Sequence, residues 1–215
     1  MQKVFYIFRH GQTDYNATRR VQSFLDIPLN QQGIDQAKEL AKKLSGVQFD
    51  CIYSSPLSRA LETARIVSQN RDIEIINNPG LKERNLGVLC GKLVNVTNEP
   101  VDTPFDVNAD IVNIPSALLF NNDYAPENGE SYTMFYKRVR ETMTEIAKST
   151  KSKTIGVSTH GGVISSLIRQ FTGFSNGGTP NTGYIKMQWD GKTFTLIETP
   201  DWLLKVNALT QSGRQ

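Results

Sequence analysis

The chain contains 215 residues, with 24 lysines and arginines against 21 aspartates and glutamates, and its formal net charge is +3. A chain of this length suits one domain of moderate size, or a domain with a cap. It buries about 70% of its unfolded surface, so it needs no disulfide or metal to fold. The balanced charge gives no argument for nucleic acid or a membrane surface as a partner. No apolar run reaches about 18 residues, so we expect no membrane-spanning helix.

The N-terminal apolar run is short. Residues 4–8 lead directly into Arg9 and His10, so we interpret the run as a core strand rather than a signal peptide. The two cysteines, Cys51 and Cys90, have no metal-binding or redox spacing. We therefore expect the protein to work in the reducing cytoplasm.

Strand and helix patterns alternate through the first half of the chain. In order, we predict a strand at residues 4–8, a polar loop over 12–30, a helix over 31–45, and strands at 51–53 and 73–76. Gly46 fits a C-terminal cap of the first helix. Ser55 and Pro56 fit the N-cap and first position of a helix between the two short strands. Arg59 then lies in the first turn of that helix.

The second half continues the alternation and ends in a hairpin. We predict a helix opening at residues 129–131 and ending near 148, a strand at 154–159, a helix to about 171, and a hairpin of 184–189 and 194–198 joined by Asp190-Gly191. Trp202-Leu203-Leu204 is expected to pack against the body. Alternating strands and helices favour a three-layer α/β fold, a largely parallel central sheet flanked by helices.

Residues 92–129 break the pattern. Four prolines and many asparagines interrupt this stretch, and only residues 111–120 favour some helix. We interpret it as a cap-like insertion over the site within a single domain spanning residues 1–215. An ordinary surface excursion is the alternative.

The chain has only two histidines, and both follow a strand and precede a glycine. His10 ends the first strand, and His160 ends the strand at 154–159. Ligands of open α/β sheets bind beyond the carboxyl ends of the strands. Since arginines lie nearby, the repeated context favours a site over two unrelated structural histidines.

An ordered set of motifs surrounds these histidines. The set is Arg9-His10-Gly11, Thr13, Asn16, Ser54-Ser55-Pro56-Leu57-Ser58-Arg59-Ala60, Glu83 and His160-Gly161-Gly162. It resembles the histidine phosphatase superfamily, and more narrowly its phosphoglycerate-mutase-like branch. The resemblance covers nearly the whole chain in order.

The resemblance implies roles for individual residues. His10 is the expected nucleophile and forms a phosphohistidine, and His160 lies on the phosphate. The implied catalytic residues are Arg9, His10, Arg59, Glu83 and His160; the implied substrate-binding residues are Arg9, Gly11, Asn16, Gln22, Ser23, Arg59, Arg84 and Gly161. No metal or other cofactor is expected. The expected partner is a small phosphorylated substrate, and the protein is expected to be a monomer or homodimer.

The residue types fit that chemistry on their own terms. The guanidiniums of Arg9 and Arg59 match phosphate oxygens bidentately, without a metal. A nucleophilic histidine must be neutral, and a backbone carbonyl of the Gly11 turn is a candidate to fix its tautomer. One carboxyl group, Glu83, can protonate the leaving alkoxide and then activate water. The plainer alternatives are that Arg59 pairs with its helix neighbour Glu62 and that Glu83 is a solvated loop residue.

Several functions compete. The first is a metal-independent phosphomonoesterase. A cofactor-dependent phosphoglycerate mutase is less favoured, because mutases of this branch carry Glu-Arg-His-Tyr-Gly where this chain has residues 83–87, Glu-Arg-Asn-Leu-Gly. A sugar bisphosphatase and a non-catalytic phosphate-binding module are the other candidates. The chain also departs from residues common in the family at Gln12, Tyr15, Ser23 and Cys90, which bears on substrate preference.

The charge of the insertion suggests a preference among substrates. Residues 92–129 contain one basic residue, Lys92, against six acidic ones: Glu99, Asp102, Asp106, Asp110, Asp123 and Glu127. If they face the site, they disfavour a second phosphate, because like charges near a protein surface repel by about 4 kcal/mol at 4 Å. We therefore expect monophosphates to be preferred to bisphosphates, unless Arg84 binds the second phosphate. The alternative is that the acidic residues face outward.

Overall fold

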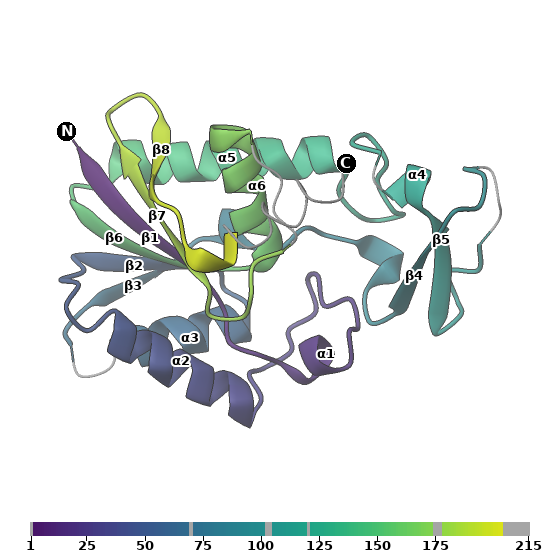
Figure 1. Cartoon of the computed structure of the whole chain (residues 1–215), viewed down its shortest axis with the longest axis horizontal. Coiled ribbons are helices and arrows are strands. Elements are labelled where there is room, and N and C mark those ends of the chain that lie inside the picture. The colour runs from purple at the N-terminus through teal and green to yellow at the C-terminus, as the bar shows by residue number, and fades with distance from the viewer. Residues whose placement is uncertain (1, 69–70, 102–104, 120, 174–177, 204–215) are drawn as a thin grey trace.

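A computed structural model describes residues 2–68, 71–101, 105–119, 121–173 and 178–203. Its centre is a six-stranded sheet of order β3-β2-β6-β1-β7-β8 (Figure 1). The strands are β1 (Lys3–Arg9), β2 (Cys51–Ser54), β3 (Glu74–Asn77), β6 (Thr154–Thr159), β7 (Tyr184–Trp189) and β8 (Phe194–Glu198). The first four run parallel, whereas β7 pairs antiparallel with both β1 and β8. The predicted, largely parallel sheet is confirmed.

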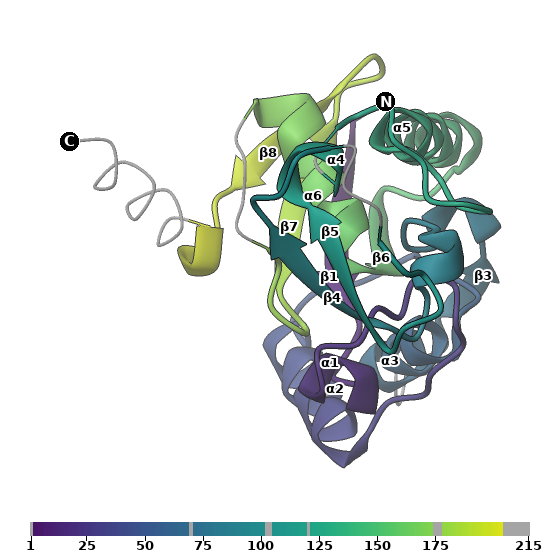
Figure 2. The same ribbon diagram turned by 90° about the vertical axis from the view of Figure 1, so that its right-hand side faces the viewer.

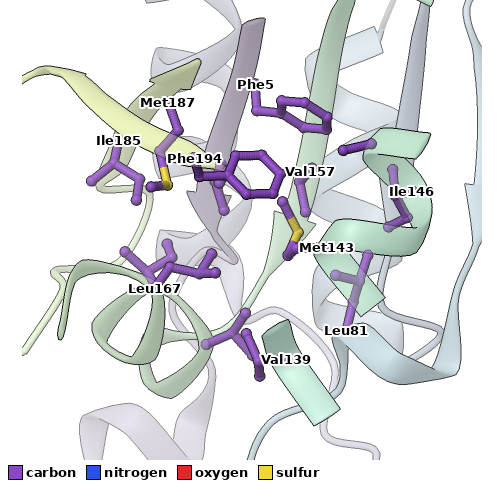
Figure 3. Close-up of a cluster of buried hydrophobic side chains, with 14 of the residues drawn as sticks. Phe5, Leu81, Val139, Met143, Ile146, Val157, Leu167, Ile185, Met187 and Phe194 are labelled. Atoms are coloured by element: carbon purple, nitrogen blue, oxygen red, sulfur yellow. The ribbon is translucent and has the colours of Figure 1, made fainter. Parts of the chain in front are cut away.

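Helices cover both faces of this sheet, as Figure 1 shows. They are α2 (Gln31–Lys43) and α3 (Ser58–Ser68) on one face, and α5 (Tyr132–Ser149) and α6 (Gly161–Thr172) on the other. The apolar cluster under α5 and α6, part of which Figure 3 shows, includes Phe5 and Val157 of the sheet and Val139 of α5. On the other face, Phe8 and Ile52 pack against α2 and α3. This is the predicted three-layer arrangement.

A second, two-stranded unit lies beyond the carboxyl ends of the parallel strands. It consists of β4 (Leu93–Thr97) and β5 (Ile111–Pro115), paired in parallel, followed by the short helix α4 (Ser116–Leu119). Figure 2, viewed from that side, shows the pair in front of β1 and β6. Its own apolar cluster contains Leu89, Val112 and Ile114. We call β4, β5 and α4 the outer unit.

The outer unit corrects the helix prediction for residues 111–120. Residues 111–115 are strand, residues 116–119 are helix, and residue 120 lies outside the described residues. Residues 111–115 form a strand because Val112 and Ile114 alternate with the exposed Ile111 and Asn113. The buried face of the strand packs in the apolar cluster of the outer unit. The strand at residues 93–97 was not predicted from the sequence either.

Other differences are at element boundaries. Helix α3 begins at Ser58 rather than just after Ser55, because its first backbone hydrogen bonds go to the carbonyl of Leu57. Helix α2 ends with Leu44 as its C-cap, at φ −96°, so Gly46 is not the cap. The polar loop after Gly11 contains a single helical turn, α1 (Asp14–Ala17), which Thr13 caps.

The predicted hairpin and C-terminal contact are present. The side chain of Asp190 accepts hydrogen bonds from the amides of Lys192 and Thr193 within the β7–β8 turn. Leu203 is 1% exposed and packs in the core with Trp202 beside it, while Leu204 lies outside the described residues. None of the described helices is long and apolar enough to cross a membrane.

Candidate active site

His10 follows the last residue of β1, and only 3% of its surface is exposed. Its Nδ1 lies 2.6 Å from the carbonyl oxygen of Gly11. Because a carbonyl only accepts, Nδ1 carries the hydrogen, which leaves the lone pair on Nε2. Burial, followed by the charges of Arg59 and Arg9, holds the pKa of His10 well below its usual value. His10 is therefore a neutral imidazole whose Nε2 is unprotonated.

The turn after His10 requires a glycine because another backbone segment touches it. A Cβ on Gly11 would lie 2.2 Å from the carbonyl oxygen of Gly33 in α2. The amide of Gly11 also donates to the hydroxyl of Thr63 in α3. Two helices thus fix the carbonyl that sets the tautomer of His10.

His160 comes from the neighbouring strand and is fully buried at the N-terminus of α6. Its ring centroid lies 5.2 Å from that of His10. Its Nε2 is 2.8 Å from the hydroxyl of Ser55, which also accepts from the amide of Leu57. That arrangement favours a hydroxyl that donates to Nε2 and an N–H on Nδ1. Burial and then Arg59 lower the pKa of His160 well below its usual value.

Two guanidiniums accompany the histidines, that of Arg59 buried and that of Arg9 partly buried. Arg59 is 1% exposed and donates to the backbone carbonyls of Ser23 and Leu25, not to Glu62. Desolvation lowers the pKa of Arg59 to about 10, so it stays charged at neutral pH. Arg9 donates to the carbonyl of Thr179, and burial lowers its pKa as well. The positive charges of Arg9 and Arg59 are therefore held in a poorly solvated environment next to the histidines.

Three polar atoms at this place have no hydrogen-bond partner. Among the described residues, six buried side-chain nitrogen and oxygen atoms are unpaired, and Nε of Arg9, Nε of Arg59 and Nδ1 of His160 are three of them. Leaving a buried donor unpaired costs about 1–3 kcal/mol each. Donors gathered beside a neutral histidine suit an anion with several oxygens.

Two backbone amides hold the carboxylate of Glu83 at the edge of the site. Its carboxylate accepts the amide of Arg84 at 2.8 Å and the amide of Gly162, in the first turn of α6, at 2.9 Å. A Cβ on Gly162 would lie 2.1 Å from Oε1 of Glu83, so this approach depends on glycine. Glu83 is not a solvated glutamate paired with Lys82, whose ammonium lies over the ring of Phe24.

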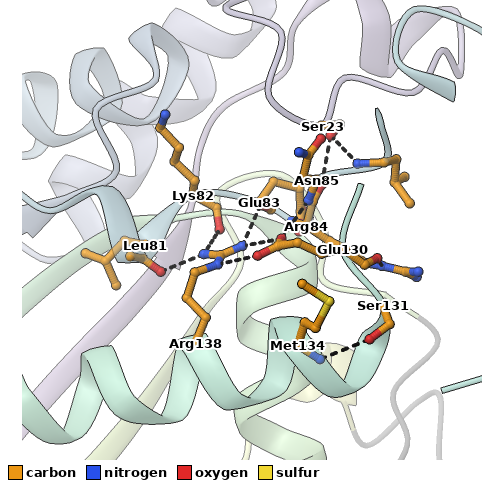
Figure 4. A network of polar contacts seen from close by, with 12 residues as sticks. Ser23, Leu81, Lys82, Glu83, Arg84, Asn85, Glu130, Ser131, Met134 and Arg138 are labelled. Carbon is orange, nitrogen blue, oxygen red and sulfur yellow. Dashed lines mark hydrogen bonds and ion pairs between the residues drawn. The ribbon is translucent and has the colours of Figure 1, made fainter. Parts of the chain in front are cut away.

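A network from α5 holds the segment that carries Glu83 (Figure 4). Arg138 donates to the carbonyls of Gly80, Lys82 and Glu83 and to both carboxylate oxygens of Glu130. Burial alone would raise the pKa of Glu130, but hydrogen bonds from Arg138 and the amide of Asn85 hold it below its usual value. Arg138 and Glu130 are not among the residues that the sequence predicted for the site.

The loop after β1 supplies polar groups that brace one another. Asn16 accepts from the amide of Thr13 and from the side chain of Asn181. The hydroxyl of Thr13 donates to Gln22. Ser23, at φ 49°, donates to the carbonyl of Arg84 and accepts from the amide of Leu86, so its hydroxyl ties the two site loops together.

These side chains border a cavity of about 640 Å³. Seven predicted site residues line it: Arg9, Asn16, Gln22, Ser23, Arg59, Glu83 and Arg84. The two histidines are not among the lining residues; they are buried beside Arg9 and Arg59, whose charges act on both rings. Gly161 lies against the side chain of Arg9, whereas Gly11 packs against Gly33 and does not line the cavity. The structure therefore brings the predicted set together. Arg20 and Arg169 also line the cavity, which the sequence analysis did not anticipate.

Arg84 is occupied by protein groups. It is 5% exposed, its Nε donates to the carbonyl of Glu130, and another nitrogen donates to the carbonyl of Tyr124. Its guanidinium carbon lies 3.8 Å from the ring centroid of Tyr132. A role in binding a second phosphate would require it to leave these partners.

The acidic residues of the insertion face outward in the described part of the chain, which is the alternative that the sequence left open. Of the six acidic residues of the insertion, Asp102 lies outside the described residues, and the other five are exposed and do not line the cavity. Asp110 forms an ion pair with Arg20 at 2.6 Å. The reason is solvation: exposed carboxylates avoid the desolvation cost that an apolar cavity wall would impose.

The fold and the site define a class. The site combines a neutral buried histidine at the carboxyl edge of a parallel sheet with two guanidiniums, a second histidine and a positioned carboxylate, an arrangement that suits phosphoryl transfer. A family model described as "Histidine phosphatase superfamily (branch 1)" matches residues 5–201. The chain belongs to this superfamily, and it is an enzyme of the histidine-phosphatase kind.

Individual relatives agree with this class but differ in activity. The chain is 35% identical over 166 residues to a phosphoglycerate mutase-like protein of Arabidopsis thaliana, covering 75% of this chain and 67% of the relative. It is 31% identical over 175 residues to a metal-independent phosphoserine phosphatase of the same plant, covering 80% and 70%. A phosphoglycerate mutase structure from Bacillus anthracis superposes with a TM-score of 0.74 at 25% identity, covering 96% of this chain and 97% of that one.

Proposed function

We propose that the protein is a metal-independent phosphatase that hydrolyses phosphomonoesters of small metabolites through a phosphohistidine on His10. The observation that carries the proposal is the hydrogen bond from Nδ1 of His10 to Gly11, which keeps Nε2 unprotonated and directs it away from that carbonyl. The lowered pKa of His10 favours the reactive neutral form throughout the physiological range.

In the first step, Nε2 of His10 attacks phosphorus and the ester oxygen leaves. Arg9, Arg59 and the Nδ1–H of His160 stabilise the charge on the phosphoryl oxygens, because their unpaired donors need an acceptor. Glu83 gives its proton to the departing alkoxide. The products are a free alcohol and phosphohistidine.

In the second step, the Glu83 carboxylate takes a proton from water, and the hydroxide oxygen attacks phosphorus. The bond from phosphorus to Nε2 breaks, which releases inorganic phosphate and restores the neutral ring of His10. Glu83 ends protonated and ready for the next cycle. Splitting the reaction into two in-line transfers is the advantage of covalent catalysis.

The decisive experiment traps the phosphoenzyme. Wild-type protein mixed with a labelled phosphomonoester and quenched in base should carry label that acid removes, as expected for phosphohistidine. His10→Asn should carry no label, whereas His160→Asn should still be labelled, though more slowly. Label of undiminished yield in His10→Asn would reject His10 as the nucleophile.

Metal independence has its own test. Turnover after treatment with EDTA should equal that of untreated enzyme, because Arg9 and Arg59 supply the positive charge that a metal otherwise provides. Loss of turnover on chelation, with recovery on adding Mg²⁺, would overturn this part of the proposal.

A mutase and a sugar bisphosphatase are the alternative activities. Both need a second phosphate to be bound, and Arg84 is already held by Glu130 and Tyr124. We therefore propose higher kcat/KM for monophosphates than for 2,3-bisphosphoglycerate or fructose 2,6-bisphosphate. A bisphosphate preference that salt weakens and that Arg84→Ala abolishes would favour the bisphosphatase; formation of 2-phosphoglycerate from 3-phosphoglycerate would favour the mutase.

Three further expectations belong to this proposal. We propose that residues 1–215 act as one domain with residues 92–129 as its cap, that the enzyme works as a monomer or homodimer, and that it acts in the cytoplasm. The free thiols of Cys51 and Cys90 are compatible with a reducing compartment. A non-catalytic phosphate-binding role is disfavoured because both histidines and Glu83 are in place.

A further inference from the structure

The cavity has two chemically different halves. The inner half carries the phosphate-binding groups around Arg9, Arg59 and Glu83. The outer half is lined by apolar and aromatic side chains from four segments: Leu86 and Leu89, Val94 of β4, Leu119 of α4, and Tyr132, Phe135 and Tyr136 of α5. An apolar wall continuous with a phosphate site has one obvious occupant, the organic part of the substrate.

The charges around the outer half restrict which organic groups can bind there. Among the described lining residues, the only carboxylate is Glu83, at the inner end. Two cations lie against the aromatic wall: Arg84 over Tyr132, and Arg169 with its guanidinium carbon 5.7 Å from the ring centroid of Tyr136. These two guanidiniums would repel a positively charged organic group, because no carboxylate lines the outer half among the described lining residues. They would not repel a neutral apolar group.

The size of the cavity points the same way. Its volume of about 640 Å³ falls within the range of about 300–1,000 Å³ typical of sites that enclose whole small molecules. A single phosphate fills only the inner part. The remaining space suits an organic group of ring size or larger.

We propose that the preferred substrates are phosphomonoesters of alcohols with a bulky apolar or aromatic body and no positive charge. This inference rests on the proposed phosphatase function and specifies its substrate class. Burying apolar surface in the outer half lowers the free energy of the bound transition state, so each buried methylene group raises kcat/KM up to about fourfold.

A series of primary-alcohol phosphates tests the class with little change in the leaving oxygen. We expect kcat/KM for 2-phenylethyl phosphate to exceed that for ethyl phosphate by at least about tenfold. We expect 3,3-dimethylbutyl phosphate to exceed its cationic isostere, choline phosphate, by a similar factor. Equal values within each pair would overturn the inference while leaving the phosphatase function intact. No turnover of any ester, with no acid-labile adduct, would overturn the function itself and the inference with it.

A matched pair of variants locates the effect. Val94 and Val96 project from the same side of β4, but Val94 lines the cavity, whereas Val96 is outside it and 49% exposed. Val94→Asn should lower the 2-phenylethyl to ethyl ratio of kcat/KM severalfold, and Val96→Asn should keep the wild-type ratio. Leu119→Asn on α4 is a second variant, in case Val94→Asn folds poorly. Unchanged ratios in both cavity variants would overturn the proposed subsite.

Discussion

Arg138 binds both carboxylate oxygens of Glu130, at 2.8 and 2.7 Å, and the same guanidinium donates to the carbonyl of Glu83 at 3.0 Å. Neither Arg138 nor Glu130 lines the cavity. The pair fixes the backbone that carries the proposed acid, and the charge of Arg138 also contributes to the lowered pKa of His160. We therefore propose that Arg138 is a positioning residue.

Replacing this residue should therefore affect the proton-transfer role of Glu83. We expect Arg138→Met to lower kcat/KM for an alkyl phosphate by about 100-fold, because small misplacements of reacting groups have effects of that size. The loss for 4-nitrophenyl phosphate should be much smaller, since that leaving group needs little protonation. Arg140→Met, an exposed arginine of the same helix, is the control. Equal losses for both esters would indicate general damage rather than mispositioning.

Glu83→Gln tests the acid directly. The amide keeps hydrogen-bonding capacity but cannot give or take a proton, so alkyl phosphates should lose about 10²–10⁴-fold in rate. Aryl phosphates should lose less in the first step and accumulate phosphoenzyme, because the hydrolysis step still lacks its base. Burst kinetics with 4-nitrophenyl phosphate would reveal that accumulation. A uniform decrease without a burst would leave Glu83 a merely structural role.

Gly162→Ala should separate folding from catalysis. Alanine is favoured over glycine inside a helix by about 1 kcal/mol, so α6 should not be weakened by propensity. The added Cβ would, however, lie 2.1 Å from Oε1 of Glu83 and displace the carboxylate. We expect turnover of alkyl phosphates to fall sharply while the protein stays folded by circular dichroism. Gly161→Ala, whose Cβ would meet Arg9 only at 3.4 Å, should be milder.

The buried histidines predict how stability depends on pH. Both have pKa values below the unfolded value of 6.5, so the unfolded chain binds more protons than the folded one below that pH. Stability should thus be highest above about pH 6.5 and fall as the pH decreases, by at most about 2.7 kcal/mol per pH unit for two groups. Urea unfolding from about pH 7 to about pH 5 measures the slope. His10→Asn should roughly halve it; an unchanged slope would contradict the assignment.

Much of the site was predictable because of where strands end. β1 and β6 are parallel neighbours with Arg9 opposite Thr159, so the residues that follow them, His10 and His160, must meet at one edge. Strand periodicity and the glycines after each histidine were sufficient to infer this. Even the carbonyl of Gly11 as the tautomer-fixing acceptor followed from the turn.

Other parts depended on long-range contacts that no local pattern encodes. The pairing of β4 with β5 joins strands separated by residues 98–110, a stretch rich in proline and asparagine that concealed it. Arg138 did leave a signal, because it follows Phe135 by three positions and so borders the buried stripe of α5. A charge at such a position needs partners, but only the fold identifies them.

The outer unit packs around an apolar cluster of its own, separate from the two clusters of the main sheet. The apolar packing of the outer unit is therefore largely separate from that of the main sheet, which positions His10, Arg59 and His160. We therefore expect substitutions of Val94 and Leu119 to leave the positions of the proposed phosphoryl-transfer groups largely unchanged. Substitutions in the outer unit should therefore change which alcohol the enzyme accepts. The proposed phosphoryl-transfer steps should stay the same.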